Sequence, residues 1–166
     1  NSAILSLILG SLLIIAYISF RFELKFALGG VIALVHDIII AIGVIALLGY
    51  EINSSFIAAI LTILGYSIND TIVVYDRIRE NLKRHKGLSL ENIIDNSVND
   101  VMRRSLNTSF TTLLAVLAVL IFGGDTLKSF MVTLLVGIGI GTYSSIFVAS
   151  PVVYLLEGKL KSKIKL

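Results

Sequence analysis

Residues 65–81 read Gly65-Tyr66-Ser67-Ile68-Asn69-Asp70-Thr71-Ile72-Val73-Val74-Tyr75-Asp76-Arg77-Ile78-Arg79-Glu80-Asn81. The first part of this stretch continues an apolar segment that begins near Ser54, and the second part is a dense cluster of charges. Asp70 therefore lies inside a segment of membrane length, roughly 8 Å before its charged end at a helical rise of about 1.5 Å per residue. A carboxylate at such a position costs about 2.5–3.5 kcal/mol on insertion scales, and intramembrane carboxylates are usually functional. Asp70 is therefore the first candidate for a functional site.

The composition places the chain in a membrane. Hydrophobic residues make up 56% of the 166 residues, charged residues make up 15%, and the mean hydropathy is +0.94. A soluble domain of this size could not bury so much apolar surface, and the apolar runs are longer than core helices require. The net charge of +3 is divided among segments that flank the apolar runs, which argues against nucleic acid as a partner. The chain has no cysteine, and we expect neither a metal nor a cofactor.

Five apolar segments approach the length of about 20 residues that a spanning helix needs. They cover residues 3–20, 26–48, 54–75, 104–122 and 130–156. The sequence therefore predicts an all-α integral membrane protein with a bundle of five transmembrane helices. Pro151 is expected to bend the last of them near its end. A further helix over 89–102, capped by Ser89 and apolar on one face, is predicted to lie at the cytoplasmic interface. A solvated helical hairpin end is the alternative for this segment.

The basic residues predict the orientation of the bundle. All 14 lysine and arginine residues except Lys128 fall in segments on one side of the predicted spans. By the positive-inside rule these segments are cytoplasmic, which places the N-terminus outside and the C-terminus inside. An outer N-terminus without a signal sequence predicts that the chain is part of a longer subunit with at least one more span.

Arg104 begins a polar face on the fourth predicted span. Thr108, Thr111 and Thr112 follow it at spacings of four, seven and eight residues. Pairing of Asp70 with Arg104 would offset the desolvation of both charges, and a pair that opens and closes can be tied to protonation. The alternative is that Arg104 anchors the helix to lipid headgroups by snorkelling.

Two further patterns lie inside the predicted spans. His36 and Asp37 lie near the middle of the second span, about 16 Å from its inner boundary, where either can relay protons or serve as a structural hydrogen-bonding group. Small residues at intervals of four along the fifth span predict a close approach of two helices. These small residues are Gly137, Gly141, Ser145 and Ala149. No Gly-Lys-Ser/Thr sequence follows the glycines, so they do not indicate a phosphate-binding loop.

Several blocks carry a resemblance to a known family that extends over essentially the whole chain. The blocks are Val35-His36-Asp37, Gly65–Asn81, Ser97-Val98-Asn99, Thr108-Ser109-Phe110-Thr111-Thr112-Leu113-Leu114 and Gly141-Thr142-Tyr143-Ser144-Ser145-Ile146-Phe147. In these blocks the chain resembles the SecF half of the SecDF protein-export family, a relative of the resistance-nodulation-division transporters. The resemblance implies a six-span subunit of the prokaryotic cell (inner) membrane, with a large external domain between its first two spans. This chain would hold spans two to six.

The resemblance also implies partners and site residues. A SecF subunit would pair with a SecD half, act beside the SecYEG channel and use the proton gradient to promote export of polypeptides across the lipid bilayer. Asp70 matches the intramembrane aspartate of the family, Arg104 its functional arginine and Asp37 its polar His-Asp position. Arg103 is a second candidate for the arginine that points into the bundle, and Arg104 is favoured because it lies on the same helix face as the threonine hydroxyls. The supporting polar residues are Ser67, Asn69, Thr108, Ser109, Thr111 and Thr112.

The leading hypothesis is therefore a non-enzymatic, energy-coupling subunit. The alternatives are an efflux or lipid transporter of the same superfamily, and a structural scaffold without proton coupling. An intramembrane aspartyl protease that uses Asp37 and Asp70 is disfavoured, because a catalytic dyad must share a proton and the two depths differ by roughly 8 Å.

Overall fold

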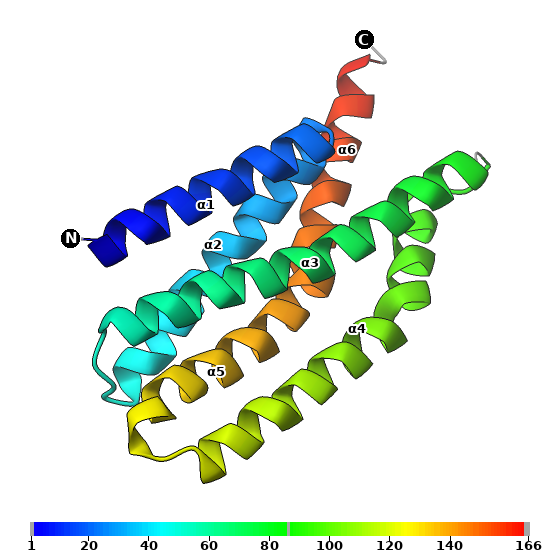
Figure 1. The fold of residues 1–166 in the computed structure, drawn as a ribbon. Coiled ribbons are helices and arrows are strands. Elements are labelled where there is room, and N and C mark those ends of the chain that lie inside the picture. The colour runs from blue at the N-terminus through cyan, green and yellow to red at the C-terminus, as the bar shows by residue number, and fades with distance from the viewer. Residues whose placement is uncertain (1, 86, 165–166) are drawn as a thin grey trace.

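The chain folds into helices that run back and forth, joined by short turns, and only the last helix continues onward from the one before it. The computed structural model describes the backbone of residues 2–85 and 87–164, and the side chains of residues 5–85 and 87–157. Within these ranges every regular element is a helix, so the predicted all-α architecture is confirmed. The helices are α1 (Ser2–Arg21), α2 (Leu24–Leu47), α3 (Ser54–Arg84), α4 (Leu90–Phe122), α5 (Asp125–Phe147) and α6 (Ala149–Ile164) (Figure 1).

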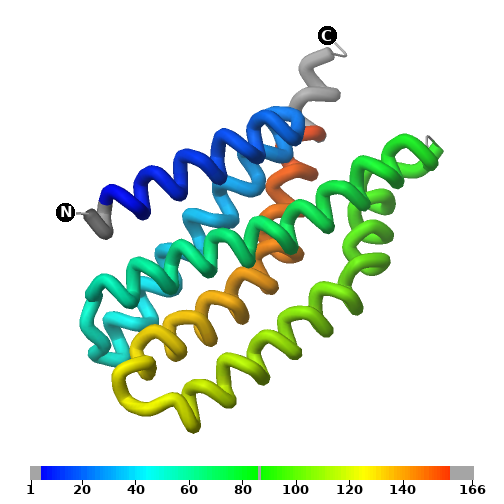
Figure 2. The backbone as a smooth tube through the Cα atoms, viewed as in Figure 1, coloured from blue at the N-terminus to red at the C-terminus, as the bar shows by residue number. Residues whose placement is uncertain are grey.

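Helix α3 occupies the centre of the bundle. It packs against each of the other five helices, and its apolar side chains Ile60, Ile63 and Leu64 are almost completely buried. The turn between α2 and α3 lies at the same end of the molecule as the turn between α4 and α5 (Figure 2). The outer helices expose large apolar side chains such as Leu12 and Leu13, which is the surface expected of helices in contact with lipid.

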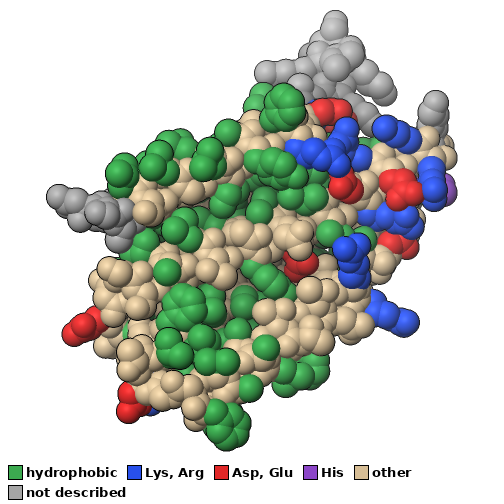
Figure 3. Space-filling view, viewed as in Figure 1, with side chains coloured by type: hydrophobic (Ala, Val, Ile, Leu, Met, Phe, Trp, Pro, Cys, Tyr) green, Lys and Arg blue, Asp and Glu red, His purple; other side chains and the backbone are tan. Residues whose placement is uncertain are grey.

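Among the residues that the structure describes, four stretches of helix are long and apolar enough to cross a membrane. They are Leu24–Leu47, Ser54–Arg84, Leu90–Phe122 and Asp125–Glu157, and the part of α1 with described side chains adds a shorter apolar helix, Leu5–Arg21. In the space-filling view, the basic side chains gather at the end that holds the α1–α2 turn and the end of α3 (Figure 3). Lys86 and the side chains of the lysine-rich tail, residues 159–165, lie outside the described residues.

Helix α4 differs from the expectation of a separate interfacial helix. The segment predicted over 89–102 continues into the fourth apolar segment as one helix of 33 residues. No glycine or proline lies between Leu90 and Phe122, so nothing in the sequence stops the helix at residues 102–103. Ser89 caps the N-terminus as predicted, since its side chain accepts a hydrogen bond of 3.3 Å from the Asn92 N–H. The first turns of α4 lie against the charged end of α3 (Figure 1).

The last apolar segment is interrupted near Pro151. Helix α5 ends at Phe147, and α6 begins at Ala149 after the single residue Val148. Proline has no N–H, so Pro151 cannot donate to the Phe147 carbonyl four residues earlier, and a helix tolerates proline best in its first turn. The break therefore precedes the proline by one turn.

Polar contacts outside the apolar spans hold α4 to α3. Asn81 is buried and donates to Ser97 Oγ at 2.9 Å, while Arg77 Nε donates to Asp100 at 2.8 Å. Arg77 also donates to Glu80 at 2.8 Å. The hydrogen bonds from Arg77 hold the pKa of the Asp100 and Glu80 carboxyls below their ordinary values. These residues form a clamp between α3 and α4, called here the charged-end clamp.

We expect Asn81→Ala to loosen the charged-end clamp by about 1–2 kcal/mol, because it removes a buried hydrogen bond and leaves Ser97 without its donor. The measurement is amide hydrogen exchange of the full-length protein, and faster exchange is expected over residues 90–101. Asn99→Ala is the control, since Asn99 is exposed on the same helix. Equal exchange in the two variants would contradict the role assigned to Asn81.

Candidate functional site

Asp70 lies on α3 at its contact with α4. Its side chain is almost fully buried at 5% relative exposure, and its Oδ2 atom has no hydrogen-bond partner among the described residues. Two groups of α4 act on the carboxylate, the Ser105 hydroxyl and the positive charge of Arg104. Asp70 is therefore a buried acid whose polar surroundings come from one neighbouring helix.

The two candidate arginines of α4 lie in different surroundings. Both are exposed, but Arg104 is the one whose charge acts on Asp70. Arg104 also lines a cavity of about 540 Å³ together with residues of the charged-end clamp. The structure thus favours Arg104 over Arg103 as the charged neighbour of Asp70. Arg104 does not form a hydrogen bond with the Asp70 Oδ2 atom.

The hydroxyl face that follows Arg104 is oriented differently from the expectation. Thr108 and Thr111 are exposed and Thr112 is half-buried, and each hydroxyl donates to a carbonyl of its own helix at 2.8–3.0 Å. The buried hydroxyls of α4 are Ser105 and Ser109. The threonines therefore lie beside the buried face of α4 that carries Ser105 and Ser109, and no other described helix of this chain covers Thr108 and Thr111. Asn69 is likewise exposed, on the side of α3 away from the core.

Asp37 is the centre of a second buried site that joins three helices. Its side chain has 0% relative exposure, and its Oδ2 atom accepts hydrogen bonds from Ser67 of α3 at 2.6 Å and from Ser144 of α5 at 2.8 Å. The Nδ1 atom of His36 lies 3.1 Å from the other carboxylate oxygen. The His36 side chain is 30% exposed, so it connects the buried carboxylate to the surface of the bundle.

Ser144 is a member of the Asp37 site that the sequence did not single out. A serine inside a helix can bond back to a carbonyl of its own helix, as Ser144 also does with Gly141 at 3.2 Å. The signal available in the sequence was its position three residues after Gly141, on a helix rich in small and hydroxyl residues.

Further hydroxyl pairs join the same helices. Thr71 of α3 pairs with Ser145 of α5 at 2.9 Å, and Tyr66 of α3 donates to Ser109 of α4 at 3.3 Å. Ser109 in turn pairs with Thr142 of α5. These contacts satisfy the hydroxyl groups inside an apolar bundle, where unpaired polar groups are costly.

The small residues of α5 and α6 lie at the contact of these helices with α3. A methyl group added at Gly137 would overlap the Ile63 side chain, and one added at Gly141 would lie 3.0 Å from Ser67 Cβ. Ala149 is fully buried, and its carbonyl accepts a hydrogen bond of 3.4 Å from the Tyr75 hydroxyl. Close backbone approach at small residues is the usual packing mode of membrane helices.

The two buried aspartates belong to different helix contacts. Asp37 faces Ser67 and Ser144 at the junction of α2, α3 and α5, whereas Asp70 faces α4. A proteolytic dyad would need both carboxylates to share one proton, and each is engaged with different neighbours. Within the described ranges, no group of three His, Cys, Asp or Glu side chains could hold a metal ion.

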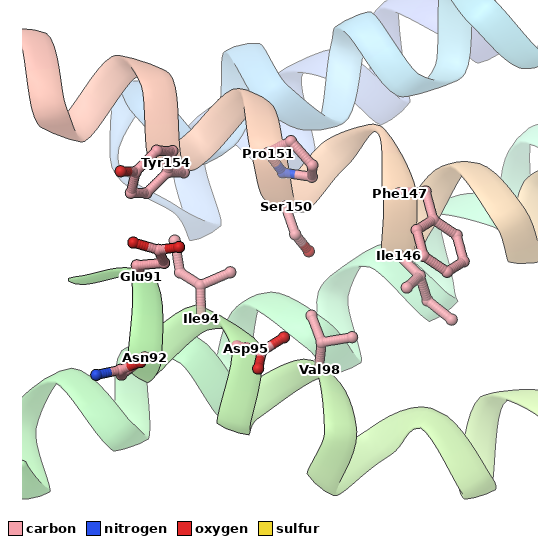
Figure 4. Close-up of a pocket in the computed structure, with 10 residues that line it drawn as sticks. All are labelled: Glu91, Asn92, Ile94, Asp95, Val98, Ile146, Phe147, Ser150, Pro151 and Tyr154. Atoms are coloured by element: carbon pink, nitrogen blue, oxygen red, sulfur yellow. The ribbon is translucent and has the colours of Figure 1, made fainter. Parts of the chain in front are cut away.

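A separate cavity of about 450 Å³ lies between the start of α4 and the α5–α6 junction (Figure 4). Glu91 and Asp95 lie on its α4 side, and Pro151 and Tyr154 lie on its α6 side. The rest of its lining is mainly apolar, and it includes neither of the buried aspartates. We therefore assign the candidate site to the two aspartates within the bundle.

Comparisons with known proteins agree with this arrangement. The model of the protein export membrane protein SecD/SecF, C-terminal, family matches residues 1–159. The protein translocase subunit SecF of Sebaldella termitidis is 58% identical over 95% of this chain and 51% of its own length. The SecF subunit of Petrotoga mobilis is 49% identical over 89% of this chain and 49% of its own length.

A solved structure is similar as well. The crystal structure of SecDF from Thermus thermophilus, described as a translocon-associated membrane protein, superimposes with a TM-score of 0.91 at 44% identity. The match covers 95% of this chain and 22% of that chain. This chain spans about half the length of the curated relatives it matches. Because several of its helices are long and apolar enough to cross a membrane, and because the family model and its relatives match nearly the whole chain, the chain is a multi-pass membrane protein that belongs to the SecD/SecF protein-export family.

Proposed function

We propose that this chain is the membrane-embedded part of a SecF-type subunit that uses the proton gradient to promote export of polypeptides. The observation that carries the proposal is the buried Asp70 carboxylate on α3, which faces Ser105 and the charge of Arg104 on α4 inside an apolar bundle. A carboxylate in such surroundings can exchange a proton and thereby change its attraction to a neighbouring cation. No cofactor and no enzymatic step is part of the proposal.

The coupling acts through the contact between α3 and α4. Ionised Asp70 attracts Arg104, and protonation removes that attraction, so the two protonation states favour different separations of the helices. The charged-end clamp holds α4 to α3 at one end through Arg77, Asp100, Asn81 and Ser97. A movement of α4 relative to α3 would therefore be smallest at the charged-end clamp and largest at the C-terminal end of α4.

The uncovered polar face of α4 supports a partner within the membrane. Arg104, Thr108 and Thr111 are exposed in this chain although they lie in or beside an apolar span. A SecD half packed on this face would cover it and would complete the surroundings of Asp70. The SecYEG channel and the exported polypeptide are the further partners in this proposal. The excess of basic residues supports a cytoplasmic position of the clamp.

Asp37 and His36 form a second proton-exchanging pair in this proposal. If His36 carries its proton on Nε2, its Nδ1 atom can accept a proton from Asp37, and its partial exposure provides access. The efflux or lipid transporter of the same superfamily remains the second candidate, because a buried carboxylate near an arginine would serve such a transporter equally well.

We expect Asp70→Asn and Arg104→Met each to abolish the gradient-dependent part of export, because one variant removes the titrating group and the other removes the charge it controls. The measurement is export of a secreted protein into vesicles containing the full-length complex, with and without a proton gradient. Arg103→Met is the matched control, since Arg103 is also exposed on α4, whereas the charge that acts on Asp70 is that of Arg104.

Unchanged gradient dependence in assembled Asp70→Asn complexes would overturn the proposal. Loss of a small-molecule or lipid transport activity, with export intact, would favour the second candidate. Assembly with the partner subunit is checked by co-purification, so that loss of export through misfolding is separated from loss of coupling.

A further inference from the structure

Three contacts fix the register of the antiparallel helices α3 and α4. Tyr66 donates to Ser109, Arg77 donates to Asp100, and Asn81 donates to Ser97. Between the first and last of these pairs, α3 advances by 15 residues while α4 retreats by 12, so the register drifts by less than one turn. Asp70 is one turn beyond Tyr66, and Ser105 is one turn before Ser109. The register therefore places Asp70 opposite Ser105.

The Ser105 hydroxyl is unusual among the hydroxyls of α4. Thr108 and Thr112 donate to carbonyls of their own helix, and Ser109 is bonded to Tyr66 and Thr142. Ser105 is only 1% exposed, and its Oγ atom has no hydrogen-bond partner in the part of the chain that the structure describes. Asp70 Oδ2 is buried and lacks a partner as well. Two unpartnered polar atoms thus face each other across the α3–α4 contact, in an environment where such atoms are rarely left unsatisfied.

We propose that Ser105 is the positioning residue for Asp70, and that its hydroxyl pairs with the carboxyl group in both protonation states. A hydroxyl group can donate a hydrogen bond to an ionised carboxylate and can accept one from a protonated carboxyl. Arg104, the charged group of α4 that acts on Asp70, can donate to a carboxyl oxygen but cannot accept the O–H of the protonated carboxyl, because a guanidinium has no acceptor. Ser105 therefore keeps Asp70 satisfied when its attraction to Arg104 is lost, which makes the protonated state accessible within the bundle.

This inference rests on the proposed function, since it assigns the group that stabilises both states of Asp70. It also predicts a strict requirement at position 105. Threonine retains the hydroxyl and should substitute for serine, whereas alanine leaves Asp70 without its partner. Valine has nearly the shape of threonine and tests the hydroxyl alone.

The test is infrared difference spectroscopy of the full-length complex in membranes across a pH titration, together with export. The Asp70 carbonyl band is identified as the one absent from Asp70→Asn. In Ser105→Ala and Ser105→Val we expect this band to move to higher frequency, because the carboxyl loses its hydrogen bond, and gradient-dependent export to fall about tenfold. Ser105→Thr should restore both. Ser129→Ala is the matched control, because Ser129 of α5 also has a buried hydroxyl without a partner and is not a neighbour of Asp70.

The outcomes separate this inference from the proposed function. An unchanged Asp70 band and unchanged export in Ser105→Ala would overturn the role of Ser105, while loss of gradient dependence in Asp70→Asn would still support proton coupling. A band that moves equally in Ser129→Ala would also overturn it. If no Asp70 band titrates and Asp70→Asn exports normally, the proposed function itself fails.

Discussion

Gly137→Ala is expected to weaken the packing of α5 on α3 by about 1–3 kcal/mol, the usual cost of overfilling a packed contact. The added methyl carbon would lie 2.8 Å from Ile63 Cγ2 and closer still to two other Ile63 atoms, so the whole side chain would have to move. Ile63 is only 1% exposed, which leaves little space for that movement. The measurement is unfolding of the purified full-length protein in mixed micelles, followed by circular dichroism.

Gly139→Ala is a control on the same helix. Nothing lies within 4 Å of the methyl group added there, and alanine favours a helix over glycine by about 1 kcal/mol, so this variant should be as stable as the parent or more stable. Ile63→Ala leaves a cavity of its own, but it removes the atoms that clash, so the Gly137→Ala and Ile63→Ala double variant should lose less stability than the sum of the two single variants. Equal effects of the two glycine substitutions, or additive losses in the double variant, would contradict close packing at Gly137.

The strongest sequence signals were charges and small residues inside apolar runs. Asp70 and Asp37 stood out because a carboxylate in a membrane-length segment must be paired, hydrated or protonated, whatever the packing of the helices. The spacing of Gly137 and Gly141 depended only on helical periodicity, and the structure places both glycines against α3. These inferences required the geometry of one helix at a time.

The details of the sites required the packing between helices. A helical period gives the angle between Arg104 and Thr108, but it does not tell which side of α4 meets α3. The three threonines were therefore selected with Ser109, whereas the buried Ser105 was not. Ser144 was missed for the same reason, because its contact with Asp37 joins residues 107 positions apart in the chain. The segment over 89–102 differs in another way, since the change in polarity at residue 103 does not end the helix and the two segments are continuous in α4, whereas the position of the first segment at the membrane interface stays a prediction.

Asp37→Leu is expected to destabilise the protein by about 3 kcal/mol or more, because it removes the acceptor of two buried hydroxyl groups. Ser67 has no other acceptor for its hydroxyl among the described contacts, whereas Ser144 keeps a bond to the Gly141 carbonyl. Asp37→Asn should cost less than about 1 kcal/mol, since Ser67 and Ser144 both donate to one oxygen of Asp37 and a carbonyl oxygen has two lone pairs. The same unfolding measurement compares the two variants.

Asp37→Asn also separates a structural role from proton relay at this site. An amide can keep α2, α3 and α5 together, but it cannot take up or release a proton as a carboxylate does. If Asp37 exchanges a proton with His36, the stable Asp37→Asn variant should lose part of its gradient-dependent export, and His36→Gln should lose a similar part. Full export by a stable Asp37→Asn variant would leave Asp37 as the acceptor that holds three helices together, and proton coupling would then depend on Asp70 alone.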